Sequence, residues 1–417
     1  MKTIFRISLI VSALALPLCS CSDFLEKEPL SQGTEAIVFK TPEHFEQAAN
    51  ALYNMNGWKN LNGRGFEGSA VDQNTDINGL TSNGGGTVQE SDWHWDKPYS
   101  HIRTCNILLA KANEYDGNQE DIAQSVGTAY FFRAWQHFYL LQYFGGIPIV
   151  DHVLDVSDPV LFGVRNSRYE VIDFIASDLR LAIPLLPKEK DIPESDKGKV
   201  SKEAAKAFLA RVLLYEGTWE KYVPSINYDL DGDGKNDGAG SVKPDNYPSI
   251  TDMLTEAKQM AKEVIEEAQT GTFALWEECD TLSYYYLFNI DDKGGNISNF
   301  RNAGKSSNKE FIFYKKYDYD LARGGINLVH SVLSGYVTNM SAQFGESFLC
   351  RNGLPIRISY TGNMADAQNN PQFLGYETFV GEFRNRDYRF IGCCNSIPDR
   401  ISYAAQNPGR ERVDAIL

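Results

Sequence analysis

The segment from Asp121 to Tyr143 limits the possible folds most, because apolar side chains fall on most of its sides at helical spacing. A helix that is apolar on most sides needs neighbours on most sides. The segment therefore predicts a helix inside a stack of helices, ending at Gly145-Gly146. The apolar positions are Ile122, Val126, Ala129, Phe132, Trp135, Phe138 and Tyr139.

Residues that cap helix ends mark further helices. Thr41-Pro42-Glu43 supplies an N-cap hydroxyl, a proline in the first turn and an acid near the positive end of the helix. Ser167-Arg168-Tyr169-Glu170 is a capping box, and Ser201 precedes another apolar stripe. Helical periodicity also runs from Tyr99 to Ala112 and from Thr251 to Ala268. Paired helices with small and large residues in alternation suggest tetratricopeptide-like packing, interrupted by insertions.

Two regions differ in amino-acid composition from the helical segments. The stretch from Asn54 to Thr87 is rich in Gly and Asn, which disfavours regular structure. After Gly271, Tyr, Asn and Gly become frequent, with short alternating runs such as Phe311-Ile312-Phe313-Tyr314. The expected fold is therefore mainly α-helical, a tetratricopeptide-like helical scaffold with an irregular, loop-rich lobe.

The first twenty residues have the parts of a secretory signal peptide. A short basic start precedes an apolar run from Ile7 to Leu18, which is too short to cross a bilayer as a helix. Leu18-Cys19-Ser20-Cys21 fits the lipoprotein pattern, so Cys21 is the predicted lipid attachment site. The alternative is an ordinary signal peptide cut nearby. Residues 1–20 are thus expected to be a lipoprotein signal peptide, and residues 21–40 a lipidated tether.

Charge and cysteine content exclude other classes. The formal charge is −15, whereas affinity for nucleic acid depends on clustered Lys and Arg, so no nucleic-acid partner is expected. Beyond the signal region the five cysteines have neither a disulfide framework nor a metal-binding spacing, and we expect mostly buried thiols. They are Cys105, Cys279, Cys350, Cys393 and Cys394.

An acidic run has the spacing of an EF-hand calcium loop. Gly234 stands at the sixth position, where it allows the sharp turn. The twelfth position is Gly240 rather than Glu, so the bidentate ligand would come from elsewhere, with Asp245 as a candidate. The run predicts a structural Ca²⁺ site, and the alternative is a solvated acidic turn. The expected ligands are Asp229, Asp231, Asp233, Lys235 through its carbonyl oxygen, and Asp237.

Aromatic and polar residues gather in short stretches that are candidates for a ligand-binding surface. If Trp93-His94-Trp95 is extended, both tryptophans point to one side and His94 to the other. Tyr284-Tyr285-Tyr286 is a second cluster. The alternative is that the tryptophans seal a helix against the scaffold. The candidate ligand-binding residues are Asp72, Trp93, Trp95, Tyr99 and Tyr284.

No catalytic arrangement is recognisable. The six histidines lack the HExxH spacing, and neither a Gly-x-Ser-x-Gly elbow nor a phosphate loop occurs. His137, four residues after Arg133 on an apolar helix, is expected to be a hydrogen-bonded core residue. We therefore expect a protein that is not an enzyme.

Several segments resemble the SusD/RagB family of outer-membrane lipoproteins. The resemblance implies a tetratricopeptide-like scaffold with an irregular lobe, so residues 41–417 are expected to form a SusD-like domain. Family members usually run on further, with a late helix that has no counterpart here, so a domain truncated at its C-terminus is expected. The matching stretches are Cys21-Ser-Asp-Phe-Leu, Thr128-Ala-Tyr-Phe-Phe-Arg-Ala-Trp, Tyr143-Phe-Gly-Gly-Ile-Pro, Ser177-Asp-Leu-Arg-Leu-Ala-Ile-Pro-Leu-Leu-Pro and Val200-Ser-Lys-Glu-Ala-Ala-Lys-Ala-Phe-Leu-Ala-Arg-Val-Leu-Leu-Tyr, with weaker matches at Asn352-Gly-Leu-Pro-Ile and Arg384-Asn-Arg-Asp-Tyr-Arg.

The resemblance also implies a function. It predicts a lipid-anchored protein on the outside of the outer membrane, which captures an oligosaccharide or starch-like polysaccharide and delivers it to a SusC-like TonB-dependent transporter. Two alternatives are a peptide-capturing RagB-like lipoprotein and a helical-repeat adaptor that binds other proteins in a concave groove. An adaptor would ignore free glycans, an enzyme would turn them over, and a capture protein would bind them unchanged.

Overall fold

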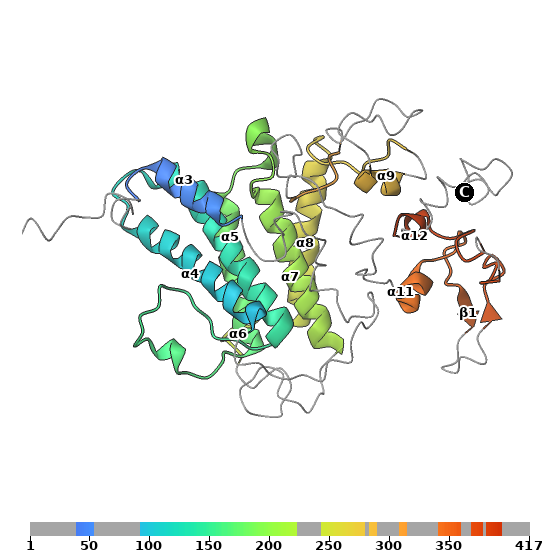
Figure 1. Cartoon of the computed structure of the whole chain (residues 1–417), viewed down its shortest axis with the longest axis horizontal. Helices are drawn as coiled ribbons and strands as arrows, with labels where there is room; N and C mark the ends of the chain where they lie inside the picture. Colours follow the sequence, from blue (N-terminus) through green and yellow to red (C-terminus); the bar gives the residue numbers. More distant parts are fainter. Residues whose placement is uncertain are drawn as a thin grey trace, which may run out of the picture.

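The computed structural model is mainly α-helical in the stretches that it describes (Figure 1), which confirms the fold class expected from the sequence. The strands in these stretches are β1 (Arg357–Ser359) and β2 (Gln368–Asn369), which pair antiparallel. Within the same stretches, no helix is both long and apolar enough to cross a membrane. The structure describes residues 39–53, 92–222, 243–279, 283–289, 308–314, 341–359, 368–377 and 381–393.

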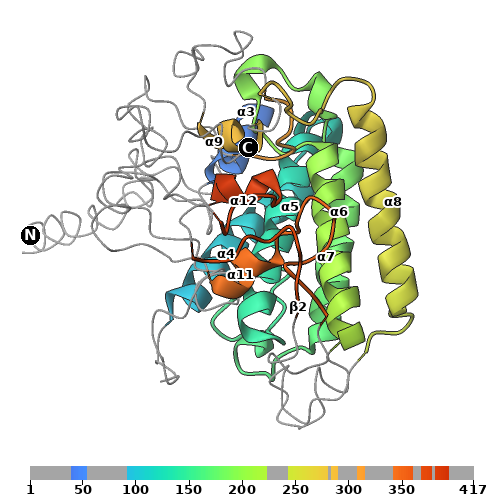
Figure 2. The same cartoon turned by 90° about the vertical axis from the view of Figure 1, so that its right-hand side faces the viewer.

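Helices α3 to α8 form the scaffold. Each helix from α4 to α8 packs against the next one along the chain, and α3 packs against α5. Figure 2 shows α5, α6, α7 and α8 side by side. Serial packing of neighbouring helices is the tetratricopeptide-like arrangement that the sequence indicates. The bounds are α3 (Pro42–Ala51), α4 (Trp93–Asn113), α5 (Gln119–Phe144), α6 (Arg168–Leu185), α7 (Lys202–Tyr222) and α8 (Ile250–Ala268), with short 3₁₀ turns η3 (Pro159–Leu161), η4 (Glu189–Asp191) and η5 (Glu194–Asp196) between them.

Helix α5 is the central helix that the sequence predicts, because α3, α4 and α6 all pack on it. Gly127 lets the end of α6 come close, since a Cβ there would lie 3.0 Å from side-chain atoms of Leu185 and Leu186. Four large side chains of α5 are almost fully buried, namely Phe131, Phe132, Leu140 and Leu141.

Capping residues explain where several helices begin. Ser167 N donates to Glu170 Oε2 (2.8 Å) and Glu170 N donates to Ser167 Oγ (3.2 Å), which confirms the capping box at α6. Ser201 Oγ accepts an N–H from the first turn of α7 at 3.2 Å. Helix α3 begins where expected, but the Thr41 hydroxyl does not cap the backbone there. It bonds the Glu43 carboxylate instead and lowers the pKa of that group.

Helix α4 begins at Trp93, earlier than the helical periodicity indicates. Asp92 caps it, because its carboxylate accepts the His94 N–H at 2.9 Å. Pro98 lies inside the helix, and a proline usually breaks a helical pattern, which hides the true start from a sequence reading. Trp93 and Trp95 are therefore helical, and the strand-like alternation considered for them is wrong.

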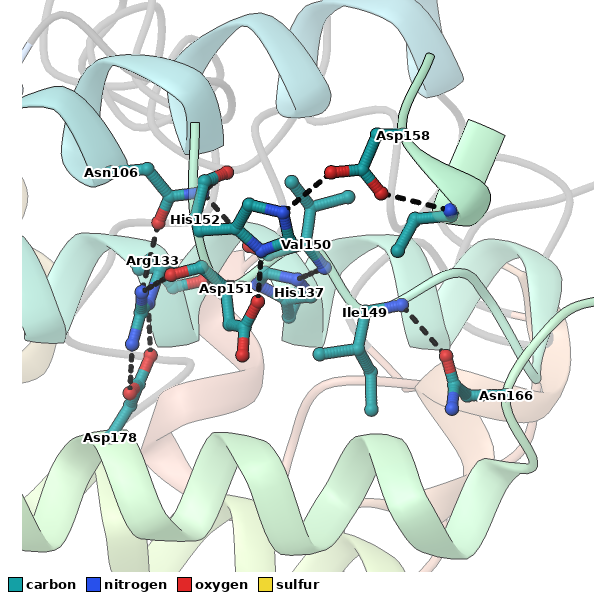
Figure 3. A network of polar contacts seen from close by, with 11 residues as sticks. Asn106, Arg133, His137, Ile149, Val150, Asp151, His152, Asp158, Asn166 and Asp178 are labelled. Carbon is teal, nitrogen blue, oxygen red and sulfur yellow. Dashed lines mark hydrogen bonds and ion pairs between the residues drawn. The ribbon is translucent and has the colours of Figure 1, made fainter. Parts of the chain in front are cut away.

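A buried polar network fastens the segment between α5 and α6 (residues 145–167, the α5–α6 segment) to the scaffold (Figure 3). Arg133 on α5 donates from Nε and Nη2 to the two carboxylate oxygens of Asp178 on α6, both at 2.7 Å. Its Nη1 donates to Asn106 Oδ1 on α4 (2.8 Å) and to Asp151 O (2.7 Å). One guanidinium thus ties three helices to the segment.

His137 is a buried member of this network, as the sequence predicts. Its Nδ1 lies 2.8 Å from Arg133 O, and Val150 N donates to its Nε2 at 3.4 Å. Since Nε2 accepts, Nδ1 carries the hydrogen that bonds the carbonyl. Burial lowers the pKa of His137 to about 3. The ring is therefore neutral near pH 7 and acts as a hydrogen-bonded core residue.

Residues 308–314 return to the scaffold. The Phe313 ring centroid lies 5.3 Å from that of Phe131 and 6.3 Å from that of Trp135, both on α5. This stretch contains no strand, so its alternating aromatic pattern does not make β-structure. It instead lets Phe313 cover aromatic side chains of the central helix.

The later part of the chain is the irregular lobe that the sequence predicts. Its short elements are joined by turns, and α9 contacts α12. A small apolar cluster of Cys350, Ile356 and Phe373 supports the lobe. The helices are α9 (Ser283–Asn289), α11 (Ala342–Ser347) and α12 (Tyr388–Cys393).

The cysteines that the structure describes in full are buried and free, as expected for small apolar residues. They are Cys105, Cys279 and Cys350. The side chains of Cys393 and Cys394 lie outside the described residues, as do Cys19 and Cys21.

Candidate functional site

A half-exposed aromatic surface forms where the start of α4 meets the end of α5. It combines aromatic side chains from both helices with one cation from the α5–α6 segment. Its members, called the aromatic surface below, are His94, Trp95 and Tyr99 of α4, Tyr139, Tyr143 and Phe144 of α5, and Arg165.

Trp95 is the centre of one half of the aromatic surface. Its ring centroid lies 5.2 Å from that of Tyr99 and 5.0 Å from that of Phe144, the latter edge-on at 83°. The Arg165 guanidinium lies 5.2 Å from the Trp95 ring centroid, within cation–π range. Trp95 is half-buried and touches the core, so it supports the scaffold and also reaches solvent.

His94 organises the other half of the surface. Its Nδ1 lies 2.7 Å from Tyr139 Oη, and its ring stacks on Tyr143 with centroids 4.6 Å apart. Tyr139 and Tyr143 are themselves 4.7 Å apart. Burial lowers the pKa of His94 and raises the pKa of Tyr139. These rings are therefore uncharged near pH 7.

The α5–α6 segment is bonded to the same surface. Tyr99 Oη donates to Pro148 O at 2.8 Å. Asn166 N donates to Ile147 O at 3.2 Å, and Ile149 N donates to Asn166 Oδ1 at 3.0 Å. These bonds fix the backbone directly beside Arg165.

The structure brings together only part of the predicted ligand-binding set. Trp95 and Tyr99 are neighbours, and His94 joins them rather than pointing away. Tyr284 lies on α9, on the far side of α7 and α8 from α4 in Figure 1. Asp72 and the side chain of Trp93 lie outside the described residues.

Sequence reasoning missed four members of the aromatic surface. Tyr139 and Tyr143 stand four residues apart on α5, a spacing that puts them on one helix face and could have been noticed. Phe144 and Arg165 carry no local signal, because only the packing of α5 against α4 and the path of the α5–α6 segment bring them to Trp95.

A small pocket lies between α3, α5 and the segment before α7. Its volume is about 200 Å³, and its lining includes Glu46, Asp196 and Lys199. Lys199 Nζ pairs with Glu46 Oε1 (2.7 Å) and with Asp196 Oδ2 (3.0 Å). Lys199, the cation of this pocket, is thus paired with two carboxylates. Arg165 of the aromatic surface, by contrast, forms no ion pair with a described residue.

The predicted calcium and lipid sites cannot be compared with the structure. Asp229, Asp231, Asp233, Lys235 and Asp237 lie outside the described residues, and so does Cys21. In the part of the chain that the structure describes, no group of three or more His, Cys, Asp or Glu side chains could hold a metal ion. Both sites stay predictions from the sequence.

Comparisons with known proteins define the family. Residues 23–214 match the profile of a SusD-like family described as starch-binding and associating with the outer membrane. A SusD-like protein from Bacteroides ovatus is 26% identical over 301 residues, which are 69% of this chain and 54% of the relative. SusD-like protein P2 from Formosa agariphila is 25% identical over 56% of this chain and 47% of its own.

Solved structures with a similar fold are also SusD-like proteins. A SusD-like carbohydrate binding protein from Bacteroides fragilis superposes with a TM-score of 0.57 at 19% identity, covering 85% of this chain and 60% of that one. A second SusD-like protein from the same species gives a TM-score of 0.51 at 18% identity, with 88% and 62% covered. Residues 23–214 are therefore similar to the SusD-like family, and the fold is that of SusD-like proteins, in agreement with the sequence motifs. The chain spans about half the length of the curated relatives that it matches.

Proposed function

We propose that this protein binds glycans at the outer-membrane surface without altering them. The observation that carries the proposal is the aromatic surface. Half-exposed rings of Trp95 and Tyr143 lie beside His94 and Arg165, and such faces suit the C–H planes of sugar rings while polar groups suit their hydroxyls. The family's description as starch-binding and the carbohydrate-binding relative from Bacteroides fragilis support this ligand class.

We also propose how the protein is placed and what it serves. A lipid on Cys21 would anchor it, and the captured glycan would pass to a SusC-like TonB-dependent transporter in the same membrane. The signal-peptide pattern before Cys21 and the family's association with the outer membrane support this arrangement.

The binding proposal is tested by Trp95→Leu, which keeps apolar bulk against the core but removes the aromatic face. Aromatic stacking is worth about 0.5 to 1.5 kcal/mol, so affinity for the best-bound glycan should fall by about two- to tenfold. Calorimetric titration of purified protein with a glycan panel measures the affinity, and chromatography of the glycans afterwards measures any turnover.

The matched control is Tyr222→Ala, because Tyr222 is an aromatic residue 72% exposed at the end of α7. It should leave glycan affinity unchanged. Unaltered affinity in a folded Trp95→Leu variant would show that the site is wrong. Cleaved glycans would favour an enzyme, and binding of peptides alone would favour a RagB-like role.

A further inference from the structure

Arg165 is the cation of the aromatic surface, and its donors have no partner among the residues that the structure describes. Its side chain is exposed. Its guanidinium rests on the Trp95 ring, while no hydrogen bond or ion pair joins it to any described residue. The five N–H donors of the planar guanidinium are thus directed to solvent or to a ligand.

Three neutral polar groups of the same surface already bond within the protein. Tyr99 Oη donates to Pro148 O, and the Tyr139 hydroxyl and His94 Nδ1 bond each other. A ligand lying on the surface therefore meets mostly aromatic faces, with Arg165 as the strongest hydrogen-bond donor. The selectivity of the surface among polar ligand groups therefore depends on which group the Arg165 guanidinium binds most tightly.

The backbone holds Arg165 in place from its C-terminal side. Asn166 bonds Ile147 and Ile149 through its backbone and its side chain. Ser167 begins α6 as its N-cap. A side chain next to two fixed residues and stacked on a half-buried ring loses little freedom when it binds, which favours a specific role.

We propose that Arg165 makes the aromatic surface selective for oligosaccharides that carry a carboxylate, such as those containing uronic acids. This inference rests on the proposed glycan-binding function and names the ligand class of the same surface. A guanidinium matches a carboxylate with two parallel charge-assisted hydrogen bonds, whereas a sugar hydroxyl accepts a single, weaker one.

The net charge of the chain does not oppose this selectivity at short range. The formal charge of −15 repels anions, but at physiological ionic strength exposed charges farther than about 8 Å are largely screened. Near the surface, the Asp92 carboxylate is engaged by the His94 N–H at 2.9 Å as the cap of α4. Arg165 therefore dominates the contact with a ligand carboxylate.

The test uses uronic-acid oligosaccharides, each paired with its methyl ester, together with neutral and sulfated oligosaccharides. Esterification removes the charge and keeps the sugar skeleton. The parent protein should bind an acid more tightly than its ester, and Arg165→Gln should reduce the acid-to-ester ratio of affinities about tenfold. Arg165→Lys should recover part of the ratio, because it restores the charge without the planar fork.

Arg211→Gln is the matched control, since Arg211 is an exposed arginine on α7 away from the surface, and its ratio should equal that of the parent. The inference is overturned if the parent prefers esters, neutral or sulfated glycans, or if Arg165→Gln keeps the ratio while Trp95→Leu still weakens binding. If no glycan in the panel binds the parent, the proposed function itself fails.

Discussion

Among individual side chains, the ion pair between Arg133 and Asp178 should matter most for stability. The two side chains are 7% and 2% exposed, and removing one partner of a buried pair leaves the other charge without compensation. We expect Asp178→Asn to lower the free energy of unfolding by about 3 kcal/mol or more. Urea denaturation followed by circular dichroism measures this change.

A more exposed ion pair, which also has one member on α6, provides the comparison. Arg180 of α6 and Glu256 of α8 lie 2.8 Å apart, and their side chains are 43% and 31% exposed. Glu256→Gln should cost at most about 1 kcal/mol, because solvent screens such pairs. Equal losses for Asp178→Asn and Glu256→Gln would contradict the role assigned to the Arg133 network.

The surroundings of some side chains can be predicted from the sequence, whereas those of others cannot. His137 could be assigned to the core because its own helix is apolar on most sides, so nearly all positions along the middle of this helix are buried. Arg165 could not be assigned, because its contact with Trp95 joins residues seventy positions apart through a loop of irregular path. Local patterns predict burial, and only tertiary packing creates the aromatic surface.

Among the elements, the α5–α6 segment should respond to pH through His152. Its Nδ1 lies 2.6 Å from Asp151 Oδ1 and its Nε2 lies 2.7 Å from Asp158 Oδ2. Both nitrogens can donate only when the ring is protonated. Hydrogen bonds to Asp151 and then Asp158 accordingly raise the pKa of His152.

Because the pKa of His152 is raised in the folded protein, the contribution of this residue to stability decreases as pH rises. The contribution of His152 to stability is complete below its unfolded pKa of about 6.5 and is lost as pH rises through the higher folded value. The difference in melting temperature between the parent and His152→Gln should therefore shrink as pH rises above about 6.5. A difference that stays constant, or grows with pH, would contradict the proposed pair of hydrogen bonds from protonated His152 to Asp151 and Asp158.

Helix boundaries show which local sequence patterns predict the start of a helix correctly and which do not. The capping box at Ser167 placed the start of α6 correctly, because side chain and backbone bond within four residues. The start of α4 was missed because Pro98, which locally signals a break, is accommodated inside the helix. The alternation of Phe311–Tyr314 gave no sign of its actual role, because Phe313 packs on α5 through a contact between residues far apart in the sequence.

The whole protein is expected to be attached to the membrane through a lipid on Cys21. Cys21→Ala removes the proposed acylation site, so the protein should lose incorporated palmitate and move from the membrane to the soluble fraction. Cys19→Ala is the control, since Cys19 follows the bulky Leu18 and should be dispensable. Labelled lipid retained by Cys21→Ala would disprove the anchor, whatever the fate of Cys19→Ala.

The overall architecture was predictable because helical periodicity is repeated along the scaffold and the family motifs follow in order. The contents of the irregular lobe were not. Its contacts, such as Arg386 donating to Gly345 O at 2.6 Å, link residues far apart with no repeating spacing. The family match, which ends at residue 214 inside α7, likewise covers most of the scaffold and none of the lobe.

The return of Phe313 to α5 has a consequence for the order of folding. During synthesis Phe131 and Trp135 emerge long before Phe313, which covers them in the finished protein. At about 5 to 20 residues per second, the delay is on the order of ten to forty seconds. Part of the aromatic face of the central helix therefore stays uncovered during this interval, and such exposed apolar surface favours association with other chains until Phe313 is available to cover it.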